Sequence, residues 1–375
     1  MIYLTVSLAL GFLTTLIGTP YARKYLLLSK IYGKDQQKPG KPRLPTSGGV
    51  AVLFGFVVSV STYLGLVSFL GSGSARLELI LASLSSVTII SIIGLIDDIH
   101  INVEGLVREE TGEDIEVDLG ASEIETPTDR LWDAFTSAVS RGDVEESAEV
   151  HREGLSQLPK MLFVLPAAFP LIAVGAGSWS MSFPVVGAVH WGIFYPLFLL
   201  PVGLLFVSNV INMLAGTNGL SAGMSFVAST ALGVFASLNG RSEAALIAFS
   251  ISVSLLAFLR YNRYPASILP GDSLTYLSGA AIFSAIVIGN MEKFGVFIFL
   301  PWIAEFFLKL RSGFSASSWG ILQDDGSLKP QHEKTYSLTH PLMRRGLTER
   351  QVTLVLTGTE TLICVVGILL FAPIP

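Results

Sequence analysis

The sequence predicts an all-α polytopic membrane protein with about ten transmembrane helices, and three observations predict this class. The chain of 375 residues is 51% hydrophobic and only 14% charged, with a mean hydropathy of +0.61, whereas about a quarter of the residues of a soluble domain are charged. Apolar stretches of about 20 residues recur along the chain, which is the length that a helix needs to cross a bilayer. Lys and Arg are concentrated in a few of the intervening segments, as expected for loops on one side of a membrane.

Ten apolar stretches are expected to span the membrane. They are residues 2–20, 49–70, 79–96, 161–177, 194–213, 224–238, 244–258, 274–289, 294–308 and 352–371. Lys and Arg cluster in residues 21–48 and 311–350, whereas residues 178–192 contain neither. The positive-inside rule therefore predicts that both termini lie outside and that the two basic loops lie in the cytosol.

An acidic insert interrupts this pattern at residues 101–156. The insert holds 16 Asp or Glu and four Arg, so its formal charge is −12 against −5 for the whole chain, and the rest of the chain is basic at +7. A basic membrane core suits a protein that handles phosphates beside anionic lipids. The chain therefore divides into a membrane domain at 1–98, the insert, and a membrane domain at 157–375 with a cytosolic loop at 311–350. A small helical module and a disordered acidic arm both remain open for the insert, as do partner binding and salt adaptation.

Asp97 and Asp98 stand at the cytosolic end of the third apolar stretch. A carboxylate at the mouth of a membrane helix is costly unless it meets water, a cation or a partner. The pair predicts either a site for cations or anionic substrates, or an ordinary span whose polar end reaches the interface.

The richest motif runs from Asn209 through Asn212 into the turn Gly216-Thr217-Asn218-Gly219. Residues three apart share one face of a helix, and a buried asparagine needs a hydrogen-bond partner or a ligand. The two glycines would allow backbone N–H groups to approach a ligand closely. A helix end followed by a surface turn would explain the glycines but not the two asparagines, so we favour a functional site.

Asp272 and Lys160 complete the set of candidates at cytosolic helix ends. Asp272 could simply cap the eighth span, and Lys160 could simply extend to the interface. Together with the aspartate pair and Asn212, however, they supply the hard oxygen ligands and the cation expected around a magnesium–diphosphate site. A metal ion there would neutralise charge that develops during phosphoryl transfer.

Five segments together resemble the polyprenyl-phosphate N-acetylhexosamine-1-phosphate transferases, a membrane family of the glycosyltransferase 4 type. They are residues 33–49, 97–98, 159–162, 209–220 and 264–272. The element A-G-T-N-G-L (215–220) is similar to the eukaryotic and archaeal branch. The resemblance implies transfer of N-acetylglucosamine-1-phosphate from UDP-GlcNAc to dolichyl phosphate, with release of UMP, as the first membrane step of lipid-linked oligosaccharide synthesis for N-glycosylation. It also implies an integral protein of a prokaryotic, archaeal plasma membrane, with its active site facing the cytosol.

The resemblance carries roles onto individual residues. Asn212 and Asp272 would hold Mg²⁺, with Mn²⁺ as an alternative, and Asp97, Asp98 and Lys160 would be catalytic residues at the phosphate site, with Asp98 either a base or an organiser. The residues expected to contact or order the nucleotide are Lys38, Lys41, Asn209, Gly216, Asn218 and Gly219. The charged residues expected in the cytosolic sugar and phosphate loop are Arg311, His340 and Arg344.

Two departures from the family pattern and several alternatives remain. About ten residues usually separate the acidic pair from the lysine, but here Asp98 and Lys160 are 62 apart, and the Arg-His-Arg element of the eukaryotic loop is missing. A related transferase that uses another UDP-HexNAc or undecaprenyl phosphate is the first alternative, and a membrane transporter is a remote one. Membrane lipids are expected as partners and nucleic acid is not, while a homodimer and a protein partner of the acidic insert remain open.

Overall fold

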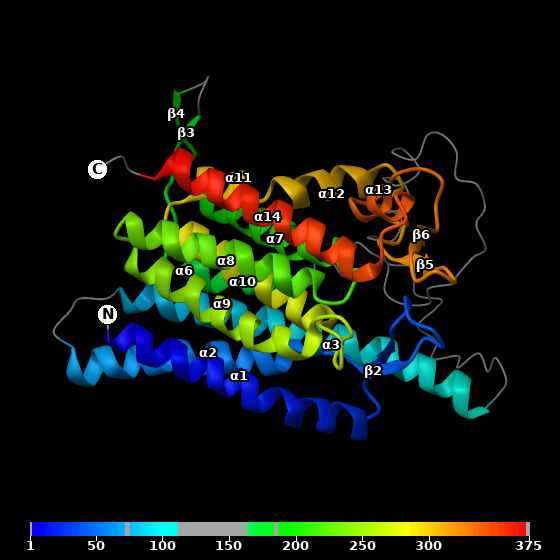
Figure 1. The fold of residues 1–375 in the computed structure, drawn as a ribbon. Helices are drawn as coiled ribbons and strands as arrows, with labels where there is room; N and C mark the ends of the chain where they lie inside the picture. Colours follow the sequence, from blue (N-terminus) through cyan, green and yellow to red (C-terminus); the bar gives the residue numbers. More distant parts are fainter. Residues whose placement is uncertain (1, 72–75, 112–161, 163, 184–186, 373–375) are drawn as a thin grey trace, which may run out of the picture.

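The computed structural model describes residues 2–71, 76–111, 162, 164–183 and 187–372, and these fold as a bundle of long helices (Figure 1). Eight helices in this part of the chain are long and apolar enough to cross a membrane, which confirms the all-α membrane class. The eight are α1 (Ile2–Leu28), α2 (Gly49–Leu70), α3 (Leu77–Thr111), the π-helical turn η2 (Tyr195–Leu199) with α7 (Leu200–Met213), α8 (Leu220–Leu238), α9 (Ser242–Asn262), α10 (Gly271–Ile288) and α14 (Glu349–Phe371). The total of ten spans and their orientation stay predictions.

The other two expected spans are not single helices in the described residues. Residues 294–308 are divided between α11 (Glu292–Ile298) and α12 (Leu300–Leu310), because Pro301 has no N–H to continue the helical hydrogen bonds across the junction. In the described part of residues 161–177 the named elements are the 3₁₀ turn η1 (Leu165–Ala168) and the short α6 (Phe169–Ala173), each of which has a proline at its first or second position. Proline at the start of a helix is well tolerated, but it interrupts a helix that would arrive from the preceding residues.

Helix α10 lies at the centre of the bundle, and every residue from Ser273 to Ile288 is buried. It packs against α2, α3, α7, α8 and α9. Two glycines allow close approach at its first turn. A Cβ atom at Gly49 of α2 would lie 2.3 Å from the Leu274 nitrogen, and one at Gly94 of α3 would lie 2.7 Å from the Asp272 carbonyl oxygen. The consecutive helices α2 and α3 therefore both meet the start of α10, which lies far from them in the sequence.

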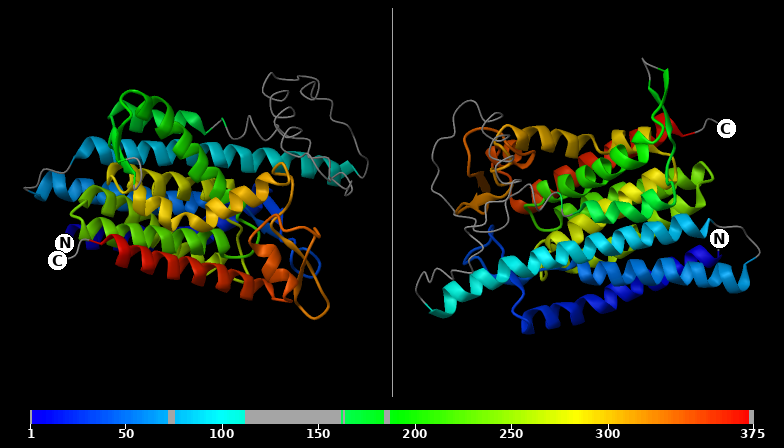
Figure 2. Two further views of the ribbon diagram at one scale, coloured as in Figure 1. Left: turned by 90° about the horizontal axis from the view of Figure 1, so that it is seen from above. Right: turned by 180° about the vertical axis from the view of Figure 1, so that it is seen from behind.

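Three antiparallel hairpins stand at the ends of the bundle. They pair β1 (Tyr32–Lys34) with β2 (Arg43–Pro45), β3 (Ser180–Phe183) with β4 (Gly187–His190), and β5 (Gly320–Leu322) with β6 (Leu328–Pro330). The first and third hairpins lie at one end, with α13 (Thr339–Arg344), while the β3–β4 hairpin, the start of α1 and the end of α14 lie at the other (Figures 1 and 2). The two loops that are rich in Lys and Arg therefore share one end of the molecule.

The acidic insert is described only at its beginning. Helix α3 does not end at the aspartate pair but continues to Thr111, so the first part of the predicted insert extends the third span as a helix. Residues 112–156 of the insert, and Lys160 after it, lie outside the described residues.

Candidate active site

Asp98 joins the end of the apolar part of α3 to the start of α10. Its side chain is buried, its Oδ1 accepts a hydrogen bond from the Asp272 N–H at 2.7 Å, and its Oδ2 accepts one from the Ser273 N–H at 3.2 Å. Gly271 has φ +69°, and a Cβ atom there would lie 2.3 Å from the same carboxylate. A carboxylate that binds the free N–H groups at a helix N-terminus is well stabilised. These contacts favour an organising role for Asp98 over that of a base.

A buried tyrosine that the sequence analysis did not identify brings the predicted metal ligands together. Tyr276 is 3% exposed and lies one turn after Asp272 on α10. Its hydroxyl lies near the side chain of Asn212, and Asp272, Asp97 and Asp98 are all close enough to act on it electrostatically. We call these five residues the α10 cluster. The structure thus gathers side chains from α3, α7 and α10, as the sequence predicted for four of them.

The donor set of the α10 cluster fits a hard cation. Asp97, Asp272 and Asn212 offer carboxylate and amide oxygens, which are the ligands that Mg²⁺ prefers. Among the described residues no group of three or more His, Cys, Asp or Glu is arranged as a complete metal site. Mg²⁺ usually keeps several waters and shares its coordination with substrate phosphates, so a partial set of protein ligands is what such a site requires.

Asn209 lies on the same helix as Asn212, and its side chain binds the backbone of that helix. It is 7% exposed, and its Nδ2 donates to the Leu205 carbonyl oxygen at 2.8 Å. This bond satisfies one donor of a buried amide. Its predicted part in ordering the site stays a prediction.

A second polar network lies at the same end of the bundle and joins two loops to α14. Asn218 donates its backbone N–H to Glu349 Oε1 at 2.7 Å and its Nδ2 to Asp35 Oδ2 at 3.3 Å. Lys38 forms ion pairs with Asp35, at 3.4 Å, and with Glu349. We call these four residues the loop interlock. It connects the β1–β2 loop, the α7–α8 turn and the first residue of α14.

The loop interlock also reaches the loop between α9 and α10. The Asn218 Oδ1 accepts a hydrogen bond from the Ala266 N–H at 2.9 Å, and the Lys38 ammonium stands 4.4 Å from the centre of the Tyr264 ring. The Lys38 side chain is only 11% exposed. Lys38 and Asn218, both predicted to contact the nucleotide, therefore hold the surrounding loops in place, while Lys41 is exposed.

The two predicted glycines of the α7–α8 turn have clear conformational roles. Gly219 has φ +78°, a value that only glycine adopts readily, and it forms the N-cap of α8. A Cβ atom at Gly216 would lie 3.0 Å from the backbone of Ser318, so the turn packs directly against the loop at residues 311–350. Gln37 bridges the same two parts, since its amide donates to the Gly216 carbonyl and accepts from the Gly320 N–H.

The charged residues predicted for the loop at 311–350 mainly make hydrogen bonds within that loop. His340 is fully buried, its Nδ1 accepts from the Tyr336 N–H at 3.2 Å, and its Nε2 donates to the Ser317 carbonyl at 3.0 Å. Burial lowers the pKa of His340 to about 4, so the ring is neutral at pH 7.

The two predicted arginines of this loop are exposed and bind loop residues. Arg344 donates to the Thr335 hydroxyl at 2.5 Å and to the His332 carbonyl at 3.3 Å. Arg311 donates to the Thr335 carbonyl at 3.4 Å. Both keep N–H groups that can face solvent, so their predicted contact with sugar or phosphate stays a prediction.

Comparison with known proteins identifies the family. The sequence model described as Glycosyl transferase family 4 matches residues 143–290. A protein of Saccharolobus solfataricus is 32% identical over 368 residues, which cover 97% of this chain and 94% of that protein. It carries the provisional name UDP-N-acetylglucosamine–dolichyl-phosphate N-acetylglucosaminephosphotransferase. The chain belongs to glycosyl transferase family 4.

Within glycosyl transferase family 4 the matches differ in extent. A protein of Sulfolobus acidocaldarius with the same provisional name is 29% identical over 365 residues, 96% of this chain and 94% of its own. A phospho-N-acetylmuramoyl-pentapeptide-transferase of Clostridium perfringens is 27% identical over 194 residues, which is 48% of this chain and 59% of that protein. The archaeal matches include both basic loops, which confirms the resemblance to the archaeal branch that the A-G-T-N-G-L element indicated.

Tyr276, Glu349 and Asp35 of this family 4 protein were not among the site residues predicted from the sequence. Tyr276 could have been found because it follows Asp272 by four residues and so shares its helix face. Glu349 follows Thr348, which forms a capping box with Gln351 at the start of α14. That box marks a helix start, but nothing in the sequence pairs Glu349 with Lys38, 311 residues earlier.

Proposed function

We propose that this family 4 protein transfers N-acetylglucosamine-1-phosphate from UDP-GlcNAc to dolichyl phosphate and releases UMP. The observation that carries the proposal is the match over nearly the whole chain to two archaeal proteins with that provisional name. In this proposal the reaction is the first membrane step of lipid-linked oligosaccharide synthesis for protein glycosylation, and the active site faces the cytosol.

The reaction requires little base catalysis. The phosphate oxygen of the lipid attacks the β-phosphorus of UDP-GlcNAc, the bond between this phosphorus and the bridging oxygen breaks, and UMP leaves with that oxygen. A phosphate monoester is already largely dianionic at pH 7, because its second pKa is near 6. Positioning and charge stabilisation should therefore supply most of the rate acceleration.

The α10 cluster supplies the groups for this stabilisation. Asp97, Asp272 and Asn212 would hold Mg²⁺, which when bound supplies positive charge next to the diphosphate. Tyr276, whose hydroxyl lies near the Asn212 side chain, would help to place that amide. Asp98 fixes the first turn of α10, and with it the Asp272 backbone, at 2.7 Å.

A transferase that uses a different sugar nucleotide or undecaprenyl phosphate is the second candidate. The partial match to the Clostridium perfringens transferase favours it. Its support is weaker, because that match covers about half of this chain.

A substrate panel distinguishes the candidates. Purified protein in detergent with Mg²⁺ would be given UDP-GlcNAc, UDP-GalNAc or UDP-MurNAc-pentapeptide, each with dolichyl phosphate or undecaprenyl phosphate. We expect UMP release to be fastest with UDP-GlcNAc and dolichyl phosphate, and mass spectrometry to find a GlcNAc-diphosphate lipid. A different preferred pair would identify the second candidate. Absence of UMP with every pair, under conditions where the protein stays folded, would overturn the proposal.

A further inference from the structure

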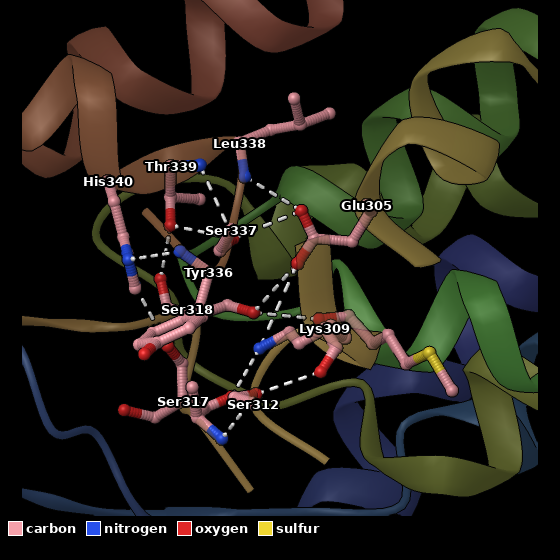
Figure 3. Close-up of polar contacts among 12 residues, drawn as sticks. Glu305, Lys309, Ser312, Ser317, Ser318, Tyr336, Ser337, Leu338, Thr339 and His340 are labelled. Atoms are coloured by element: carbon pink, nitrogen blue, oxygen red, sulfur yellow. Dashed lines mark hydrogen bonds and ion pairs between the residues drawn. The ribbon is translucent and has the colours of Figure 1, made fainter. Parts of the chain in front are cut away.

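A buried carboxylate on α12 lies outside the site described above and binds the cytosolic loop. Glu305 is 0% exposed, and its Oε2 accepts hydrogen bonds from the Leu338 N–H at 2.7 Å and the Ser337 hydroxyl at 3.1 Å (Figure 3). Lys309, one turn later, is 4% exposed and lies 3.8 Å from Glu305 Oε1. Its ammonium donates to the Ala316 carbonyl oxygen at 2.5 Å.

The two charges therefore bind both arms of the loop. The arm that leaves α12 is held at Ala316, and the arm that returns to α14 is held at Ser337 and Leu338. Removing a carboxylate and an ammonium from water is costly, and a well-packed apolar pair at such a place is often as stable or more stable. The contribution of Glu305 and Lys309 is thus to fix the position of the two arms of the loop rather than to raise the stability of the protein.

Hydrogen bonds continue from this anchor to the α7–α8 turn. The Thr339 hydroxyl donates to the Ser318 carbonyl oxygen at 2.6 Å, and the Ser318 hydroxyl donates to the Met213 carbonyl oxygen at 2.7 Å. Met213 is the last residue of α7 and follows Asn212. Ser318 is also the residue against which Gly216 packs. The position of the loop therefore determines where the turn can lie.

We propose that Glu305, with Lys309, is a positioning residue that sets the place of the α7–α8 turn, and thereby the affinity for the nucleoside-diphosphate sugar, through the cytosolic loop. This inference rests on the proposed function for its substrate. Glu305 itself touches neither the reacting atoms nor the metal ligands. Its effect should therefore appear in binding of the nucleotide more than in the chemical step.

The test compares Glu305→Gln with Glu292→Gln. Glu292 is a half-buried carboxyl at the start of α11, just beyond the far end of α10, so it controls for loss of a shielded charge. For Glu305→Gln we expect the KM for UDP-GlcNAc to rise about tenfold with kcat lowered less than about threefold, whereas Glu292→Gln should leave KM unchanged. Equal changes in KM for the two variants, or a fall in kcat alone for Glu305→Gln, would overturn the proposal.

A milder variant and a second measurement cover the case in which Glu305→Gln does not fold. Ser318→Ala keeps the Glu305–Lys309 pair and removes the hydrogen bonds from the Ser318 hydroxyl to the Met213 carbonyl oxygen, at 2.7 Å, and to Glu305 Oε1, at 3.3 Å, so it should raise the same KM by a smaller factor. Hydrogen exchange of wild type and variant, without substrate, should become at least several-fold faster at residues 213–219 in Ser318→Ala. Unchanged exchange there would overturn the proposal even if the substrate of the enzyme proved to be different.

Discussion

The α10 cluster and the loop interlock lie at the same end of the protein, and each contains carboxylates and an asparagine, but only the interlock as defined above includes a lysine. The α10 cluster gathers Asp97, Asp98 and Asp272 around one tyrosine. In the interlock, Lys38 stands between the carboxylates of Asp35 and Glu349. Several carboxylates at one place favour binding of a cation, and in the interlock Lys38 already offsets one of the two carboxylate charges. The α10 cluster is therefore the better candidate for binding a cation, and the loop interlock is the better candidate for holding the loops together.

The largest expected effect concerns the α10 cluster. Asp272→Asn should lower Mg²⁺-dependent UMP release by about 100- to 1,000-fold, because one charged oxygen donor at the diphosphate is lost. Turnover in detergent with UDP-GlcNAc and dolichyl phosphate measures this. Asp325→Asn, in the exposed β5–β6 turn, is the matched control and should be active. Near-normal turnover of Asp272→Asn would contradict the metal assignment.

The next effect concerns the interlock. Lys38→Met leaves the buried Glu349 without its cation, and we expect a loss of about 3 kcal/mol in the free energy of unfolding, measured by denaturation in detergent. The double variant Lys38→Met with Glu349→Gln should recover part of this loss, because the unpaired charge is removed. Lys41→Met, at an exposed position, should change stability by less than about 0.5 kcal/mol. If the double variant were less stable than Lys38→Met, the pairing would be wrong.

The smallest effect depends on pH and concerns the loop at residues 311–350. Burial lowers the pKa of His340 from 6.5 to about 4. Above pH 6.5 the ring is neutral in both the folded and the unfolded state, so it adds no pH dependence. Between pH 6.5 and 4 only the unfolded state takes up the proton. The free energy of unfolding therefore decreases as the pH is lowered, by at most about 2 kcal/mol at pH 5.

His340→Gln should remove this share of the acid sensitivity. The difference in unfolding free energy between pH 7 and pH 5 should be smaller in the variant than in the wild type, as denaturation at the two pH values would show. Lys309 and His332 also face the ring and lower its pKa. A variant with the same loss of stability at pH 5 as the wild type would assign the acid sensitivity to other groups.

Sequence reasoning predicted much of the fold, because spanning helices are specified by local composition. The apolar stretches at 49–70 and 274–289 correspond closely to α2 and α10. The stretch at 294–308 was wrong as a single helix, since Pro301 divides it. Hydropathy averaged over a window does not register one missing N–H group, although the proline itself was visible in the sequence.

For the candidate site, residue type indicated importance but not role. Asp272 and Asn212 were expected together, and the structure brings them to Tyr276. Lys38 and Asn218 were expected at the nucleotide, and the structure shows that they also hold loops together, while their contact with the nucleotide stays a prediction. His340 was expected to bind sugar or phosphate, and it is buried in the loop. A pattern of one chain carries no information on partners that are hundreds of residues away.

Local composition and short motifs establish the membrane class, the family resemblance and the set of polar residues at helix ends. Which of these residues share the α10 cluster and which form the loop interlock follows from the fold alone, because the groups that surround a carboxylate come from distant parts of the chain. Asp98 meets the N–H groups of α10, Glu349 meets a lysine from the first loop, and Glu305 meets a loop that the chain forms only after leaving α12.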